Sequence, residues 1–253
     1  LACHPQQAIR RELLAALFWS EKDEKNAMGN LRTSLSGLRN ISQHLEIERF
    51  SVTVPASEQL WVDILTFEKL EQITLLTSPS GLLTESELTA LTEAAKLYRG
   101  AFLQGFTLRE SEGFDEWARK QRERFHISIT RVLQKLVTHY LTTEDYAAGI
   151  SWAQRLLEIA PEDEASRRDM MSLLAGSGQT AAALQEFELL KRYLQEHGLE
   201  PSSETLRLYD EIANNGRRTT PLYPVTAPLA PPPSNLTQPL VPIVGRQQEL
   251  ERI

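Results

Sequence analysis

The sequence has very little cysteine and no long apolar segment. Cys3 is the only cysteine among 253 residues, which excludes an internal disulfide and suits a reducing compartment. There is no apolar run of 18 residues and no pattern typical of a signal peptide. We therefore predict a soluble, cytoplasmic protein that does not enter a membrane.

Motifs for catalysis are also missing. The five histidines lack the spacing of metal ligands, and the sequence has no paired cysteines and no G-x-S-x-G segment. The glycine-rich segment "GSGQT" (176–180) lacks the lysine of a phosphate-binding loop and has helical flanks, so it is predicted to be a turn. We expect no enzymatic activity, metal site or cofactor in this chain.

Negative charge is in excess, but its distribution is uneven. The net charge is −7, yet residues 1–60 carry seven Lys or Arg and seven Asp or Glu. Residues 61–216 carry 16 basic and 25 acidic side chains. Because an acidic surface repels the phosphates of a duplex, any contact with DNA is expected in the first segment.

The first segment has the order helix, helix, β-hairpin. Apolar residues recur at helical spacing in two stretches, and two short alternating stretches follow, with Glu48-Arg49 as a turn. The helical positions are Ile9, Leu13, Leu14 and Leu17, then Met28, Leu31, Leu35 and Leu38; the strand positions are Leu45 and Ile47, then Phe50, Val52 and Val54. This order is typical of a winged helix-turn-helix.

The second of these helices has a polar face without acids. If Met28 to Leu38 face a core, a step of 100° per residue places polar residues on the opposite side. Arginine can bind guanine or phosphate, asparagine can bind adenine, and hydroxyls can bind either kind of group. The candidate DNA-binding residues are Asn30, Arg32, Thr33, Ser36, Arg39 and Asn40 on the helix, and Arg49 in the wing. The alternative is an inert, solvated helix surface.

Residues 61–214 are predicted to be almost entirely helical. The segments 145–161 and 179–195 superimpose at an offset of 34 residues, the period of tetratricopeptide repeats. The predicted interior includes Leu156, Leu184, Phe187 and Leu190, and three tryptophans, Trp61, Trp117 and Trp152, are also expected in the core. Residues 217–242 hold eight of the thirteen prolines, which predicts an extended linker. A proline-rich peptide ligand is the alternative for that segment.

Several stretches together resemble the bacterial transcriptional activator domain family, which includes the Streptomyces antibiotic regulatory proteins. They occur in family order, and they are "RRELLAALFW", "NLRTSLSGLRN", "LWVDILTFEKL", "LYRGAFLQG", "FDEWARKQRERF", the repeat pair and "HGLEPSSETLRLYDEI". The resemblance implies an OmpR-like winged helix followed by a tetratricopeptide-like activator domain, with Asn30 to Asn40 as the recognition helix. Family members often have basic residues where this chain has Gly37 and Asn40, which predicts weaker DNA binding.

The last residues, "PIVGRQQELERI", resemble the entry to the signal-transducing ATPase module of larger family members. Since the sequence also has no initiator methionine, we expect a fragment of a longer protein, whose missing module could bind ATP and Mg²⁺. The expected domains are a truncated winged helix (1–58), the activator domain (61–215), the linker (217–242) and the start of the ATPase module (243–253).

The predicted fold class is mainly α: a partial winged helix-turn-helix, a tetratricopeptide-like helical array and a Pro-rich linker. The predicted function is transcriptional regulation, with double-stranded DNA bound by the winged helix. The array would contact RNA polymerase or a second copy of the chain. The alternative is a signalling scaffold with a degenerate winged helix that binds no DNA; the balanced charge of residues 1–60 favours this alternative.

Overall fold

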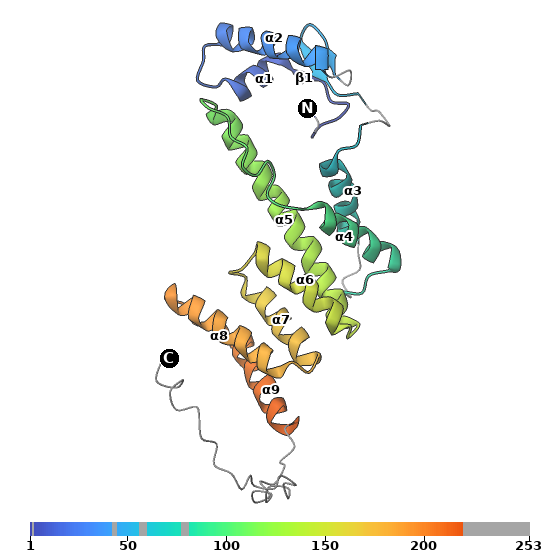
Figure 1. The fold of residues 1–253 in the computed structure, drawn as a ribbon, viewed down its shortest axis with the longest axis vertical. Coiled ribbons are helices and arrows are strands. Elements are labelled where there is room, and N and C mark those ends of the chain that lie inside the picture. The colour runs from blue at the N-terminus through green and yellow to red at the C-terminus, as the bar shows by residue number, and fades with distance from the viewer. Residues whose placement is uncertain (2, 42–44, 56–59, 77–80, 220–253) are drawn as a thin grey trace, which may run out of the picture. The chain divides into compact units, whose positions relative to one another are not determined.

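The protein is mainly helical, with one small sheet (Figure 1). The computed structural model describes residues 1, 3–41, 45–55, 60–76 and 81–219. The helices in these ranges are α1 (Arg11–Phe18), α2 (Glu24–Ile41), α3 (Asp63–Leu76), α4 (Glu85–Leu97), α5 (Glu112–Thr142), α6 (Tyr146–Ile159), α7 (Glu164–Gly176), α8 (Thr180–Glu196) and α9 (Ser203–Thr219). The chain divides into two units, Leu1–Gly216 and Arg217–Ile253. The expected linker from residue 220 onward and the expected ATPase entry at 243–253 lie outside the described residues.

The sheet contains three short antiparallel strands in the order β1-β3-β2. They are β1 (Ile9–Arg10), β2 (Glu46–Ile47) and β3 (Ser51–Thr53). The hairpin of β2 and β3 occurs where the alternating residues predict it, with Ile47 opposite Val52. The assignment of Ile9 to a helix was wrong. Ile9 pairs with Val52 in the sheet, and the N–H of Arg11 donates to the carbonyl of Phe50, so α1 begins only at Arg11.

The sheet, α1 and α2 share one small core. Its buried members are Leu14, Ala15, Ala27, Leu31, Leu35 and Val52. Leu31 and Leu35 are therefore confirmed as core positions of α2. Leu13 and Leu38 were also expected to be buried, but their exposed fractions are 53% and 41%. Because α1 starts late, its inward face is centred on Leu14 and Ala15, and Leu38 lies in the last turn of α2, after the buried Leu31 and Leu35.

The remaining helices enclose a larger core. Its residues come from α3 to α9, and α5 contributes the most deeply buried stretch, with Ile129, Val132, Leu133, Leu136 and Val137. Among the predicted interior residues, Leu156, Phe187 and Leu190 are buried, whereas Leu184 is only partly buried. The prediction for Trp61 was wrong, because its exposed fraction is 63%. It precedes α3 and therefore lies outside the stacked helices.

Local hydrogen bonds explain where several of these helices begin. Thr84 and Glu87 form a capping box at α4: the N–H of Glu87 donates to Thr84 Oγ1, and the N–H of Thr84 donates to Glu87 Oε2 at 2.7 Å. Asp145 caps α6 and Asp163 caps α7 by accepting from backbone N–H groups three residues ahead. These side chains satisfy N–H groups that would otherwise lack partners in the first helical turn.

The two cores meet where α1 ends and α5 begins. The rings of Phe18 and Phe114 stack with centroids 5.6 Å apart, and the N–H of Gly113 donates to Ser20 Oγ at 3.1 Å. A Cβ atom at Gly113 would lie 3.1 Å from the carbonyl oxygen of Leu17, which is tighter than ordinary contact. A glycine at this position therefore allows α5 to approach α1 closely.

The burial of Leu190 makes it a direct test of helix stacking. Leu190→Asp would place an unpaired carboxylate among the packed helices, which should lower the free energy of unfolding by several kcal/mol. We expect a clearly lower melting temperature by circular dichroism. Leu189→Asp is the matched control, because Leu189 is 40% exposed on the same helix. Equal melting temperatures for the two variants would show that position 190 is not buried in solution.

The raised pKa of Asp169 in α7 should make the stability of the folded protein depend on pH. Burial raises the pKa of Asp169 from 3.8 to about 6; Arg168 opposes this shift and Asp163 adds to it. Because the folded-state pKa is the higher one, the folded state loses stability as pH rises between these values. Asp169→Asn should therefore stabilise the protein by about 1–2 kcal/mol at pH 7.5. The gain should nearly vanish at pH 4 in thermal melts, and a gain independent of pH would contradict this account.

Candidate nucleic-acid interface

Helix α2 begins at a well-defined cap. Asp23 Oδ1 accepts a hydrogen bond from the N–H of Asn26 at 3.1 Å, and Asp23 also bonds the side chain of Asn26. The backbone hydrogen bond lowers the pKa of Asp23, so the cap stays ionised at neutral pH. The helix then runs without an acidic residue from Lys25 to Ile41. A polar surface free of negative charge is what a phosphate backbone requires.

The predicted side chains on α2 do share an accessible surface. Arg32, Thr33, Ser36 and Arg39 are exposed, and Asn30 is partly exposed. The structure places Asn40 within α2, but its side chain is outside the described part of the chain. Gly37 is also exposed and has open space where a side chain would lie. The face is therefore accessible, although it presents fewer cations than the resemblance would suggest.

Arg32 and Arg39 differ in their surroundings. Arg32 has no hydrogen bond or ion pair with any side chain or backbone group in the described ranges. Arg39 donates from Nη2 to the carbonyl of Ile47 in β2 at 3.3 Å, which joins the helix to the hairpin. Arg39 therefore holds the wing as well as offering its remaining N–H groups to a ligand. A substitution of Arg32 therefore tests ligand contact without also loosening the hairpin, which a substitution of Arg39 would do.

The tip of the hairpin contains two features that the sequence pattern did not reveal. Phe50 was predicted to be an alternating apolar position of a strand, but it precedes β3 and is 63% exposed, and the Arg49 guanidinium lies 5.0 Å from its ring centroid. Arg11 donates from Nη1 to the carbonyl of Arg49 at 3.2 Å. Arg11 thus positions the wing from α1. No spacing rule connects residues 11 and 49, so the sequence carried no signal for this contact.

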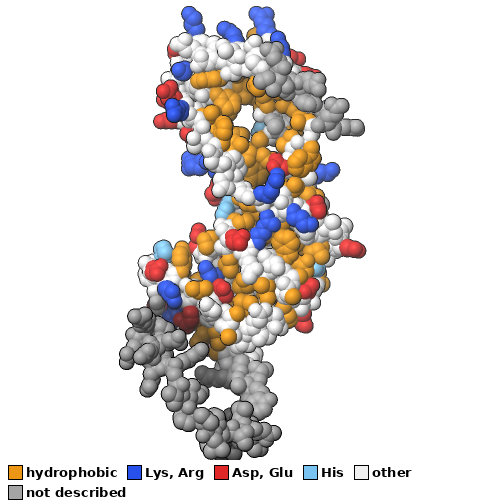
Figure 2. Space-filling model, in the orientation of Figure 1, with side chains coloured by type: hydrophobic (Ala, Val, Ile, Leu, Met, Phe, Trp, Pro, Cys, Tyr) orange, Lys and Arg blue, Asp and Glu red, His pale blue; other side chains and the backbone are white. Residues whose placement is uncertain are grey.

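The space-filling view (Figure 2) shows basic side chains on the surface that α2 forms. Lys and Arg side chains project from the surface that α2 forms, as Figure 2 shows when it is compared with Figure 1. Acidic side chains occur at the edge of this surface, where Glu24 lies in the first turn of α2, and on other parts of the visible face. The arrangement presents exposed cations, hydroxyls and an amide on one helix, beside a hairpin carrying a further arginine. Such a surface can donate hydrogen bonds to phosphate oxygens and to acceptors on base edges.

Comparison with known proteins addresses the rest of the chain. The bacterial transcriptional activator domain matches residues 62–213, which is more than half of the sequence. The chain belongs to this family. The matched segment extends from the start of α3 to the buried Ile212 of α9, so it covers the helical array described above. No curated protein matches the chain.

A similar fold is found among solved structures. It is Mycobacterium tuberculosis EmbR in complex with a low-affinity phosphopeptide, with a TM-score of 0.62 and 16% sequence identity. The match covers 85% of this chain and 57% of the EmbR chain. The family supports a transcriptional activator, and the likeness to EmbR supports a fold that is mainly helical. Among the described residues, no helix is both long and apolar enough to cross a membrane.

Proposed function

We propose that this activator binds double-stranded DNA through α2 and the β2–β3 hairpin. The observation that carries the proposal is the accessible, acid-free face of α2, with Arg32, Thr33, Ser36 and Arg39 exposed together. The helix can present these side chains to the major groove, while Arg49 at the wing contacts the adjacent backbone. Asn30 and Asn40 complete the proposed set of contacts.

The helical array is proposed to bind protein, either RNA polymerase or a second copy of the chain. Its acidic composition argues against DNA as its ligand, since 25 acidic side chains outnumber 16 basic ones in residues 61–216. The alternative is a scaffold that does not bind DNA. The equal numbers of acidic and basic side chains in residues 1–60 favour that alternative.

We also propose that the chain acts without catalysis and without bound nucleotide, as a cytoplasmic protein. Residues 177–179 form the turn between α7 and α8, with Gly178 at a φ of +82°. A phosphate loop instead follows a strand and directs its N–H groups at the ligand. Titration calorimetry with ATP and Mg²⁺ should therefore show no saturable heat, and saturable binding would overturn this part of the proposal.

DNA binding is tested with the purified protein and double-stranded DNA. A duplex is first enriched from a random-sequence library by repeated binding, and its affinity is then measured at several salt concentrations. Arg32→Ala should cost about 1–3 kcal/mol if Arg32 contacts a base, or reduce the salt slope by about one unit if it contacts phosphate. Arg32 has no partner within the described structure, so this loss reports on DNA contact.

Arg192→Ala is the matched control, because it removes the same charge from an exposed position on α8. Its affinity for the enriched duplex should equal that of the parent protein. If no duplex is enriched, or if the two variants behave alike, the scaffold function is correct and DNA binding through α2 is not.

A further inference from the structure

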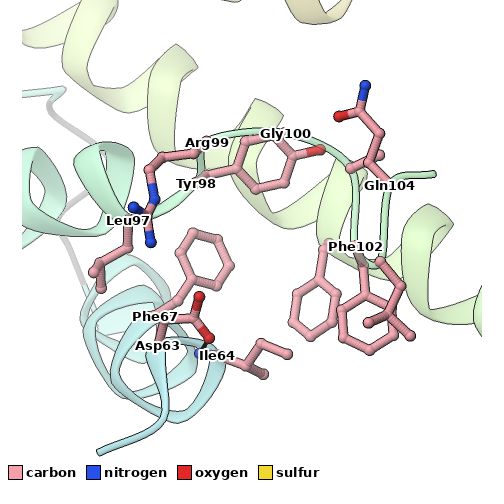
Figure 3. Close-up of a pocket in the computed structure, with 12 residues that line it drawn as sticks. Asp63, Ile64, Phe67, Leu97, Tyr98, Arg99, Gly100, Phe102 and Gln104 are labelled. Carbon is pink, nitrogen blue, oxygen red and sulfur yellow. Dashed lines mark hydrogen bonds between the residues drawn. The ribbon is translucent and has the colours of Figure 1, made fainter. Parts of the chain in front are cut away.

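A pocket of about 380 Å³ lies between α3, α5 and the loop that follows α4. Phe67 of α3 and Phe125 of α5 are buried at its base, and Phe102 comes from the loop. Figure 3 shows Phe67 and Asp63 extending from α3 on one side, with Phe102 on the other. The volume is within the range of sites for small molecules, about 300–1,000 Å³.

The wall of the pocket is held in place by two arginines. Arg155 of α6 donates to the carbonyl of Tyr98 at 2.5 Å. Arg122 of α5 donates from Nε to the carbonyl of Phe102 at 2.8 Å and from Nη2 to that of Leu103 at 3.2 Å. Leu103 has a φ of +50°, a conformation that non-glycine residues seldom adopt without such support. The loop is therefore fixed at both ends, and the pocket is preformed.

The pocket has an apolar interior and two opposite charges at its edge. Ile64 and Leu97 add aliphatic surface to the aromatic rings. Asp63 and Arg99 line the pocket as well, and neither forms an ion pair with the other or with any other residue in the described ranges. Asp63 accepts only the N–H of Ile64, at 2.8 Å, so its second carboxylate oxygen has no partner in the described structure.

Tyr98 adds a polar group to the apolar wall. Burial raises the pKa of Tyr98, so its phenol remains protonated at neutral pH and can donate a hydrogen bond. Figure 3 shows Arg99 and Asp63 toward the same side of the pocket, on the loop and on α3. The site thus offers a negatively charged hydrogen-bond acceptor, the carboxylate of Asp63, and a positively charged donor, the guanidinium of Arg99, beside one apolar cavity.

We propose that this pocket binds a small zwitterion with a large apolar side chain, that is, a free apolar or aromatic α-amino acid. The side chain occupies the space between Phe67 and Phe102. The ammonium group binds the carboxylate of Asp63, and the carboxylate group binds the guanidinium of Arg99. A ligand with a single charge would satisfy only one of these two groups.

The aromatic contacts around the pocket provide a spectroscopic probe. The ring of Phe102 lies 5.6 Å from Trp117 in an edge-on arrangement, and Trp117 lies 5.6 Å from Phe114. Phe114 in turn stacks on Phe18 of α1. Because Trp117 directly contacts a residue that lines the pocket, ligand binding should change its fluorescence.

The proposal is tested by calorimetry and tryptophan fluorescence with three related compounds. L-phenylalanine carries both charges, phenethylamine lacks the carboxylate and 3-phenylpropionate lacks the ammonium group. L-phenylalanine should bind most tightly. Asp63→Asn and Arg99→Met should each weaken its binding about 10- to 100-fold, because each removes one charge-assisted hydrogen bond. In the Asp63→Asn variant, L-phenylalanine should bind no more tightly than 3-phenylpropionate does.

The controls separate binding from folding. Asp210→Asn and Arg207→Met make the same chemical changes at exposed positions of α9 and should leave binding unchanged. Trp117→Phe should greatly reduce the fluorescence change but preserve the calorimetric signal. The four charge variants should keep the parent melting temperature. The proposal is overturned if L-phenylalanine does not bind, if it binds no better than phenethylamine, or if both pocket variants bind it like the parent.

Discussion

Helix α5 is the element on which both cores depend. A helix of 31 residues is about 46 Å long, so it can contact α1 at its first turn and α6 along its later turns. Its central residues are fully buried, including Ile129, Leu133 and Leu136. A much shorter helix could not contact both α1 and α6. A substitution that bends α5 would disturb the base of the pocket as well as the contact between Phe114 and Phe18.

The chain uses arginine as a structural residue in several places. Arg122 and Arg155 bind backbone carbonyls in the loop after α4, and Arg167 of α7 pairs with Glu186 of α8 at 2.9 Å. Arg11 and Arg39 fix the hairpin in the same manner. A planar guanidinium suits this task, because its several N–H groups at fixed angles can donate to carbonyls that have no hydrogen bond within a helix or sheet. Lysine could not supply this geometry.

Periodicity predicted the elements whose residues pack against their own neighbours. Leu31, Leu35, Leu156 and Leu190 are buried as their spacing indicates, because a helical face is a local property of the sequence. The errors arose where distant contacts decide the outcome. Ile9 joins a strand only because β3 lies beside it. The pocket likewise depends on three separated segments, so no motif could have revealed it.

The charge of the array has a consequence for what can approach it. Arg167 and Glu186 neutralise each other within the array, whereas Arg122 and Arg155 keep their positive charge while they donate to backbone carbonyls. Residues 61–216 therefore keep the excess of acidic side chains that their composition indicates, 25 against 16. In the proposed complex with DNA, this excess repels the phosphates of the duplex and favours an approach through the acid-free stretch of α2, Lys25 to Ile41.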